Sequence, residues 1–200
     1  MLGAMIGDIV GSVYEWHNIK TEDFLLFKGD CFFTDDTVLT AATAKALMDG
    51  LSYVEVYQDF ARRYPGRGYG GNFSHWIHAW NPKPYNSWGN GSAMRVSPVG
   101  FAFNSIESVL QEAERSAVVT HNHPEGIKGA QATALSILLG RQGATQEDIR
   151  REIALRFDYD LDRILDEIRP NYKFDVSCQG SVPEAIIAFL ESTSYEDAIR

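Results

Sequence analysis

The chain has 200 residues, of which 44% are hydrophobic, so it is long enough to build one domain with a substantial core. Its formal net charge of −9 argues against a nucleic-acid partner, because phosphate binding needs clustered Lys and Arg. No apolar run approaches membrane-spanning length, and no basic segment precedes the apolar N-terminus. We therefore expect a cytoplasmic protein without a membrane span, whose two cysteines are free thiols.

Helical periodicity dominates the chain and predicts an all-α fold. The predicted helices cover residues 1–14, 36–48, 53–64, 105–119, 125–140, 145–156 and 158–168, followed by one that begins near Pro183 and one that Ser194 caps. Gly50 should end the second helix, Ser52 should cap the third, and Thr145 should cap another. No period-two run is flanked by hairpin turns, so no sheet is predicted. We expect a single domain over residues 1–200, built as a compact bundle of many helices.

The first predicted helix carries a glycine stripe and a polar face. Gly3, Gly7 and Gly11 recur at four-residue spacing, which predicts a flat surface against which another helix packs closely. Asp8 and Glu15 lie seven positions apart and share one face of this helix. Glu15 belongs either to a solvated face or, partly buried between aromatic residues, to a metal cluster.

The stretch FFTDDTVLT places two adjacent carboxylates at the start of the second predicted helix. One interpretation is an N-terminal cap, with Thr34 or Asp35 bonding backbone amides and the acids facing the positive end of the helix dipole. The other is a site for Mg²⁺, Mn²⁺ or Ca²⁺, since these ions prefer oxygen ligands. Asp35 and Asp36 point about 100° apart on a helix, so each would serve one of two neighbouring ions.

Two polar segments, residues 64–74 and 81–98, interrupt the helices and are long enough to indicate functional loops. The first contains GRGYGG, which matches a dinucleotide-binding pattern in letters but lacks the surrounding strand–helix–strand unit. Glycine-rich backbone nevertheless forms concave sets of N–H donors for phosphate. The alternative is an ordinary surface loop.

The second segment contains WGNGSAMR, in which Asn90-Gly91 marks a turn and Ser92 is a candidate to direct its hydroxyl into a pocket. Trp88 and Phe73 are candidates for stacking on an adenine ring. Packing in the core is the alternative for both aromatic side chains.

The stretch THNHPEG contains a His-Asn-His sequence of the kind found in metal nucleases. Such nucleases need a ββα context and a basic surface, and neither is predicted here. The simpler interpretation is a polar loop that leads into the helix near Glu125, with His121 as a candidate pocket-lining side chain.

Six stretches together resemble the ADP-ribosylglycohydrolase family, and they follow the family order over nearly the whole chain. They are GAMIGDIVGSVYEW, FTDDT, GYGGNF, GNGSAMRVSPVG, THNHPEGIKGAQATA and GSVPEAIIAFLES. The resemblance implies an all-helical orthogonal bundle that uses two divalent cations, Mg²⁺ or Mn²⁺. It also implies hydrolysis of the C1″ glycosidic bond of ADP-ribose on modified protein residues or related conjugates.

The same resemblance implies roles for individual residues. The implied metal ligands are Thr34, Asp35 and Asp36. The implied catalytic groups, which handle the attacking water, are Glu15 and Asp36. The implied ADP-ribose-binding residues are Gly68, Gly70, Gly71, Phe73, Asn90, Gly91, Ser92, Ala93 and His121.

The sequence departs from the family pattern in one respect. The family has a second ligand motif, Gly-Asp-x-Asp-Thr, soon after a segment similar to STSYEDAIR, and residues 1–200 do not contain it. We expect that the C-terminal helices and about half of the ligands of a two-ion site are missing. The alternative function is accordingly an ADP-ribose-binding module with impaired or no catalysis.

Overall fold

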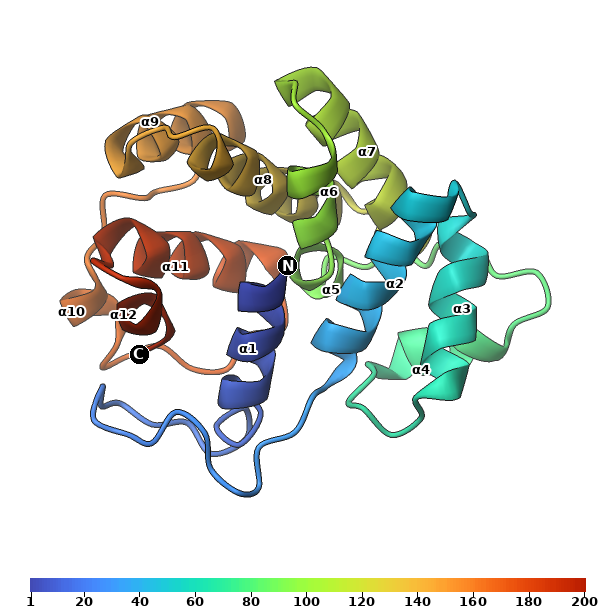
Figure 1. Ribbon diagram of the computed structural model, residues 1–200, viewed down its shortest axis with the longest axis horizontal. Helices are drawn as coiled ribbons and strands as arrows, with labels where there is room; N and C mark the ends of the chain where they lie inside the picture. The colour runs from blue at the N-terminus through green and yellow to red at the C-terminus, as the bar shows by residue number, and fades with distance from the viewer.

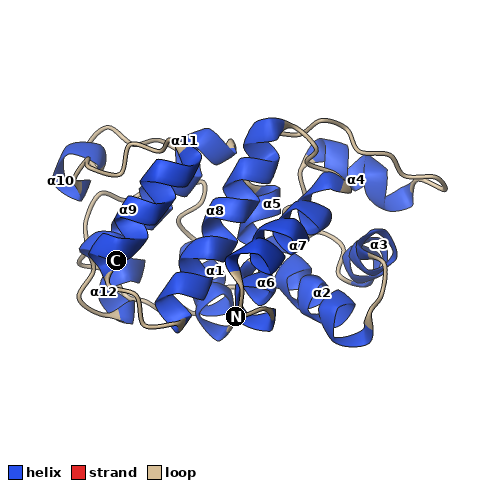
Figure 2. Ribbon diagram, turned by 90° about the horizontal axis from the view of Figure 1, so that it is seen from above, coloured by secondary structure: helices blue, strands red, loops and turns tan.

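The computed structural model describes all residues 1–200 and folds them into twelve helices joined by loops. The helices are α1 (Leu2–Gly11), α2 (Asp35–Asp49), α3 (Tyr53–Arg63), α4 (Gly71–His78), α5 (Gly91–Met94), α6 (Ser97–Ala102), α7 (Ile106–Val118), α8 (Pro124–Arg141), α9 (Gln146–Phe157), α10 (Leu165–Ile168), α11 (Cys178–Glu191) and α12 (Tyr195–Ile199). Figure 2 shows helices and loops without a strand, and the only β pairing is one isolated antiparallel bridge between Gly89 and Ser177. The all-α prediction is confirmed.

Helix α8 is the longest helix and the centre of the larger core. Helices α5, α6, α7, α9 and α11 all pack against it (Figure 1). Its buried side is made of small residues, among them Gly126, Gly129 and Ala130, so the neighbouring helices approach closely. A second core cluster joins α2, α3 and α4 around Leu39 and Tyr57.

Several predicted helix ends are confirmed. Gly50 ends α2 in the left-handed conformation, with a φ of 66°. Thr145 caps α9 by accepting a hydrogen bond from the N–H of Asp148. Ser194 caps α12 in the same way by accepting from the N–H of Asp197. The Thr145 and Ser194 side chains satisfy amides that otherwise lack partners in the first turns of α9 and α12, whereas Ser52, at the N-cap position of α3, makes no side-chain capping bond.

Three predicted helices differ from the structure. The helix expected over 158–168 is confined to α10, because Asp158 ends α9 in the left-handed conformation. Tyr159 and Leu161 then reach the core from extended chain. Helix α11 begins at Cys178, capped by Ser177, so Pro183 lies inside the helix rather than at its start. Helix α1 ends at Gly11, and Glu15 lies in the turns that follow.

The two polar segments contain helical residues that were not predicted, because their glycines are typical of loops. Helix α4 buries Phe73, Trp76 and Ile77, a helical spacing that follows directly after the glycine run. The second segment contains α5 and α6. Both segments are therefore shorter as loops than the sequence indicates, which agrees with the rarity of long loops in compact domains.

The glycine stripe of α1 does not face a closely packed helix, so that prediction is wrong in part. Gly3 contacts the ring of Tyr195 on α12, whereas a Cβ at Gly7 or Gly11 would meet no atom within 4 Å. Gly7 and Gly11 instead line a cavity of about 350 Å³ together with residues of α12. A second cavity of about 720 Å³ lies beside it, between the segment after α1 and helices α10–α12.

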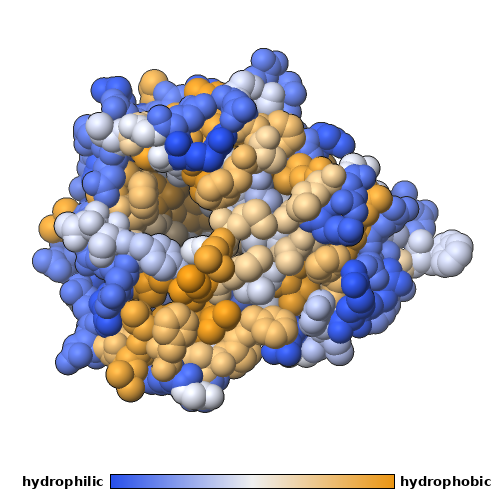
Figure 3. All heavy atoms as spheres, in the orientation of Figure 1, coloured by the Kyte–Doolittle hydropathy of each residue, from blue (hydrophilic) through white to orange (hydrophobic).

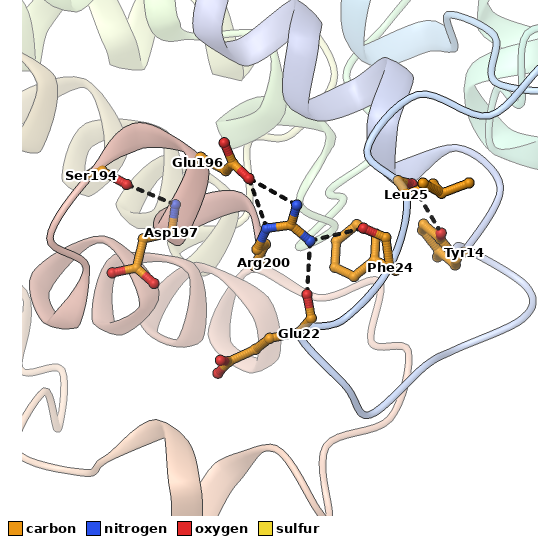
Figure 4. Close-up of polar contacts among 8 residues, drawn as sticks. All are labelled: Tyr14, Glu22, Phe24, Leu25, Ser194, Glu196, Asp197 and Arg200. Carbon is orange, nitrogen blue, oxygen red and sulfur yellow. Dashed lines mark hydrogen bonds and ion pairs between the residues drawn. The ribbon is translucent and has the colours of Figure 1, made fainter.

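The segment between α1 and α2 is held against the C-terminal helix by Arg200. The guanidinium of Arg200 donates to the carbonyl oxygens of Glu22 and Phe24, each at 2.8 Å, and pairs with Glu196 within α12 (Figure 4). Apolar side chains gather on the surface over this segment, where Leu25 and Phe27 are exposed (Figure 3).

No helix in the structure combines the length and the apolar character that crossing a bilayer requires. Both Cys31 and Cys178 are free thiols, as expected.

We predict that Gly129→Ala destabilises the fold by about 1–3 kcal/mol through overpacking between α8 and α11. A Cβ at Gly129 would lie 2.8 Å from the Cβ of Cys178. Gly140→Ala on the same helix is the control, because its Cβ would meet only Ile149, at 3.9 Å. The control should be neutral or stabilising by up to about 1 kcal/mol, since alanine favours helix. Urea unfolding measures both variants, and equal effects would contradict the packing argument.

Candidate functional site

One carboxylate of α1 holds the start of α2. Asp8 accepts hydrogen bonds from the backbone N–H groups of Thr34, at 2.9 Å, and Thr37, at 3.2 Å. It also accepts from both threonine hydroxyls. The Thr34 hydroxyl in turn accepts from the N–H of Asp36 at 3.3 Å, so Thr34 is the N-cap of α2. The cap interpretation therefore describes Thr34, whose oxygen keeps one further lone pair.

Next to this cap, two carboxylates are half-buried without a counter-charge. Burial is the main cause that raises the pKa of Asp35 and of Asp36 to about 7, with added repulsion from neighbouring carboxylates, Glu15 and Asp8 among them. Burial, followed by the charge of Asp8, also raises the pKa of Glu15. No Lys or Arg forms an ion pair with any of these acids. A bound cation would relieve this repulsion.

The first glycine loop borders the same carboxylates. The N–H of Asp35 donates to the carbonyl of Arg67 at 2.8 Å. Gly68 has a φ of 96°, and a Cβ there would lie 3.2 Å from Oδ1 of Asp35. The structure thus brings together Asp35 and the GRGYGG loop, which are more than 30 positions apart in sequence.

Arg67 is a site residue that sequence reasoning missed. Its guanidinium lies over the ring of Phe33, 3.8 Å from the centroid, and donates to the Phe33 carbonyl at 3.2 Å. It therefore ties the glycine loop to the residue just before the acidic cap. The only signal in the sequence was a single arginine between two glycines.

Gly70 and Gly71 form the start of α4. Gly70 is the N-cap position and has no side chain with which to cap, so the first amides of α4 have no side-chain acceptor. Phe73 is buried in the second core cluster, with its ring centroid 5.7 Å from that of Tyr69 and 5.4 Å from that of Trp76. The adenine-stacking prediction for Phe73 is therefore wrong, and core packing describes it.

The side chains of the second loop are engaged within the protein. The side-chain amide of Asn90 donates to the Asp175 carbonyl and to Ser181 Oγ. Ser92 is fully buried and donates to the Gly126 carbonyl at 2.7 Å, so the prediction that its hydroxyl enters a pocket is wrong. Ala93 belongs to the larger core. Any ligand contact by these residues would come from their backbone.

His121 and His123 do not form one site. His121 is buried, and burial with the nearby Arg95 charge lowers its pKa to about 3. Its ring lies against the second loop, where a Cβ at Gly91 would meet Nε2 at 3.0 Å. His123 instead caps α8, with its Nδ1 accepting from the N–H of Glu125 at 3.1 Å. This arrangement, in a chain without a β-strand pair, does not match a His-Asn-His nuclease.

The side-chain oxygen atoms at the start of α2 are of the kind that binds a hard divalent cation, but they are few. Carboxylate oxygens of Asp35 and Asp36, with the Thr34 hydroxyl, are the ligand types that Mg²⁺ and Mn²⁺ prefer. Nowhere in the chain do three or more His, Cys, Asp or Glu side chains form a group that could hold a metal ion. The residues present would therefore make up only part of a cation site.

We predict that Asp8→Ala destabilises the fold by about 1–3 kcal/mol, because it removes the acceptor of the hydrogen bonds from the backbone N–H groups of Thr34 and Thr37. Asp49→Ala, at the exposed end of α2, is the matched control and should change stability by less than about 0.5 kcal/mol. Chemical denaturation compares them, and a control as damaging as the Asp8 variant would refute the capping role.

Known proteins are similar to this chain both in sequence and in fold. A sequence model of the ADP-ribosylglycohydrolase family matches residues 1–200. The ADP-ribosylhydrolase ARH3 proteins of Mus musculus and Homo sapiens are each 31% identical over 183 residues, which cover 74% of this chain and 50% of theirs. The Xenopus tropicalis ARH3 is 30% identical over 175 residues, 72% of this chain and 49% of its own.

A solved structure described as an ADP-ribosylglycohydrolase-related protein complex superposes with a TM-score of 0.74. It covers 99% of this chain and 76% of its own at 21% identity, and so supports the fold. The chain thus spans about half the length of the curated relatives named above. With its whole length matched by the family sequence model, the chain belongs to the ADP-ribosylglycohydrolase family.

Proposed function

We propose that this protein binds ADP-ribose conjugates and hydrolyses their C1″ glycosidic bond with the help of divalent cations, Mg²⁺ or Mn²⁺. The observation that carries the proposal is the pair of half-buried carboxylates, Asp35 and Asp36, that lie without a counter-charge at the start of α2. The neighbouring Gly68 backbone leaves room beside them that any side chain would fill. Membership of the family makes ADP-ribose the natural substrate class.

The acidic residues carry two tasks in this proposal, cation binding and proton transfer. Asp35 and Asp36, with the Thr34 hydroxyl, would hold the cations, which when bound would orient the ribose diol and polarise a water molecule. Glu15 or Asp36 would accept the proton of the attacking water: burial and neighbouring carboxylates raise the pKa of both, and that of Asp36 reaches about 7. The bond breaks through a transition state with oxocarbenium character, as in glycoside hydrolysis generally.

In this proposal, backbone amides bind the phosphates and one exposed aromatic ring stacks on the adenine. The uncapped amides at the start of α4, around Gly70 and Gly71, provide donors for a phosphate without a basic patch. This explains how a chain of net charge −9 binds an anion. Of the two candidates for adenine stacking, Trp88 remains: it is half-exposed, with its ring at 5.7 Å from that of His123.

The second candidate function is binding of ADP-ribose without turnover. It is favoured by the absence of any group of three or more metal-binding side chains within the chain. Thr34, Asp35 and Asp36 alone supply fewer ligands than two octahedral ions require, so cation binding by residues 1–200 should be weak.

Calorimetry with ADP-ribose and an assay of ADP-ribose release from modified proteins, both with Mn²⁺ or Mg²⁺, separate the two functions. Release from at least one linkage (arginine, serine or another acceptor) supports the hydrolase, and Asp36→Ala should lower that release at least about 100-fold. Binding without release supports the second candidate. Neither binding nor release over a full panel of linkages would refute both.

We also predict that Asp36→Asn stabilises the protein in EDTA at pH 8 by about 1 kcal/mol. In the wild type the pKa of Asp36 rises from an ordinary 3.8 to about 7 on folding, so its charge opposes folding increasingly from pH 4 to about 7 and constantly above. The variant has no such charge. Its advantage should therefore vanish at pH 3.

Glu114→Gln is the matched control for this variant, because it removes one exposed negative charge from α7. It should shift stability by less than about 0.5 kcal/mol. Saturating Mn²⁺ should raise the melting temperature of the wild type and of the control more than that of Asp36→Asn. Equal Mn²⁺ effects on all three proteins would show that Asp36 is not a ligand.

A further inference from the structure

Arg95, which follows α5, is fully buried and has no acidic partner. Its Nη2 donates to the carbonyl of Ser116 and to the hydroxyl of Thr120, both at 2.9 Å, and its guanidinium lies 4.3 Å from the ring centroid of Tyr57. Its Nε and Nη1 have no hydrogen-bond partner. Burying a guanidinium without a carboxylate is costly, so its retention calls for a role beyond packing.

The contact between Arg95 and Thr120 fixes the direction of the next hydrogen bond. A guanidinium only donates, so the Thr120 oxygen accepts from Nη2. The Thr120 hydroxyl hydrogen then needs an acceptor, and its one remaining partner is Nδ1 of His121, at 2.7 Å. Thr120 therefore donates to Nδ1, and Nδ1 carries no hydrogen.

A histidine whose Nδ1 accepts is the neutral tautomer with its hydrogen on Nε2. The ionisable groups that face the ring are Arg95 and Tyr85, and neither is an anion that would favour a charged imidazolium. Burial and the Arg95 charge lower the pKa of His121 to about 3, in agreement with a neutral ring.

The Nε2–H of His121 points at the second glycine loop. A Cβ at Gly91 would lie 3.0 Å from Nε2, and one at Gly89 would lie 3.6 Å away. This loop is pinned from its other side, because Asn90 N–H donates to the Val176 carbonyl at 2.8 Å and Cys178 N–H donates to the Trp88 carbonyl at 2.9 Å. No protein group accepts a hydrogen bond from Nε2. The imidazole N–H and the loop backbone are thus held in fixed positions relative to each other.

We infer that Arg95 is a positioning residue which, through Thr120, locks His121 as the Nε2–H tautomer and so presents a neutral N–H donor beside the backbone of Gly89–Gly91. The ligand group that this donor would bind is an acceptor oxygen, such as a phosphate or ribose oxygen. That assignment of the ligand rests on the proposed function, whereas the tautomer itself does not. A donor that stays neutral over the physiological pH range binds an oxygen without a change in charge.

The test is the ¹⁵N and ¹³C NMR spectrum of the imidazole of His121 at pH 7, recorded on the labelled whole chain without ligand. His121→Gln assigns its signals among those of the five histidines. We expect a protonated Nε2 and an unprotonated, hydrogen-bonded Nδ1. A protonated Nδ1 in the wild type would overturn the inference, whatever the outcome of the ADP-ribose assays.

Arg95→Met tests the part played by the arginine. Without the Nη2 donor, the Thr120 hydroxyl hydrogen is free to turn toward the space that the guanidinium filled, and the oxygen can then accept from Nδ1, so the population protonated at Nδ1 should rise about tenfold. Arg151→Met, which removes an exposed arginine from α9, is the control and should leave the tautomer unchanged. An unchanged tautomer in a folded Arg95→Met protein would show that Arg95 does not set the tautomer of His121.

Thr120 variants keep the inference testable if Arg95→Met does not fold. Thr120→Val removes the hydroxyl at nearly constant volume and should move the Nδ1 resonance to that of an imidazole nitrogen without a hydrogen bond. Thr120→Ser keeps the hydroxyl and should retain the wild-type spectrum. A wild-type Nδ1 signal in Thr120→Val would show that Thr120 is not the donor.

Discussion

The structure depends most on the hydrogen bonds that Asp8 accepts from the start of α2. One carboxylate accepts from two backbone amides and two hydroxyls of Thr34 and Thr37, and so fixes where α2 begins. Asp8 forms these hydrogen bonds and is not paired with a base. Its negative charge therefore adds to that of the neighbouring carboxylates. Asp35 and Asp36 are then held beside it, half-buried, with their pKa values raised to about 7. The fold thus maintains a concentration of negative charge that a divalent cation would neutralise.

The rest of the site is built from backbone held at close range. Gly68 approaches Asp35 and Gly91 approaches His121 so closely that a side chain at either glycine would crowd its neighbour. Arg67 anchors the first loop through Phe33, and the segment before α11 anchors the second. An acidic protein can therefore offer N–H donors to an anion without any cluster of basic side chains. The one buried arginine near this loop, Arg95, acts on the orientation of a neighbouring histidine.

The sequence predicted the helices that carry their own signals. Thr145 and Ser194 bond to amides three residues on, and Gly50 adopts a positive φ, so local chemistry alone specifies those ends. The helix after 158 failed because Tyr159 and Leu161 reach the core as extended chain, a consequence of tertiary packing. Helix α4 was missed because its apolar spacing, at 73, 76 and 77, follows a glycine run that is typical of loops.

The sequence singled out residues that the structure places side by side, but it did not show which way their side chains point. Asp35, Asp36 and the Gly68 loop were singled out from residue types, and the structure brings them together. Ser92 and Phe73 were singled out by the same reasoning, yet their side chains point into the protein. No pattern in a single sequence shows which way a side chain points when helices from distant parts of the chain enclose it. For the same reason Arg95 and Arg67 gave almost no signal.

The most direct measurement is anomalous diffraction at the manganese edge from crystals of this protein grown in excess Mn²⁺. We expect an anomalous peak about 2.0–2.2 Å from carboxylate oxygens of Asp35 or Asp36, with further ligands supplied by water. Well-ordered density in which both side chains bond only protein amides, with no anomalous peak near the start of α2, would contradict the account.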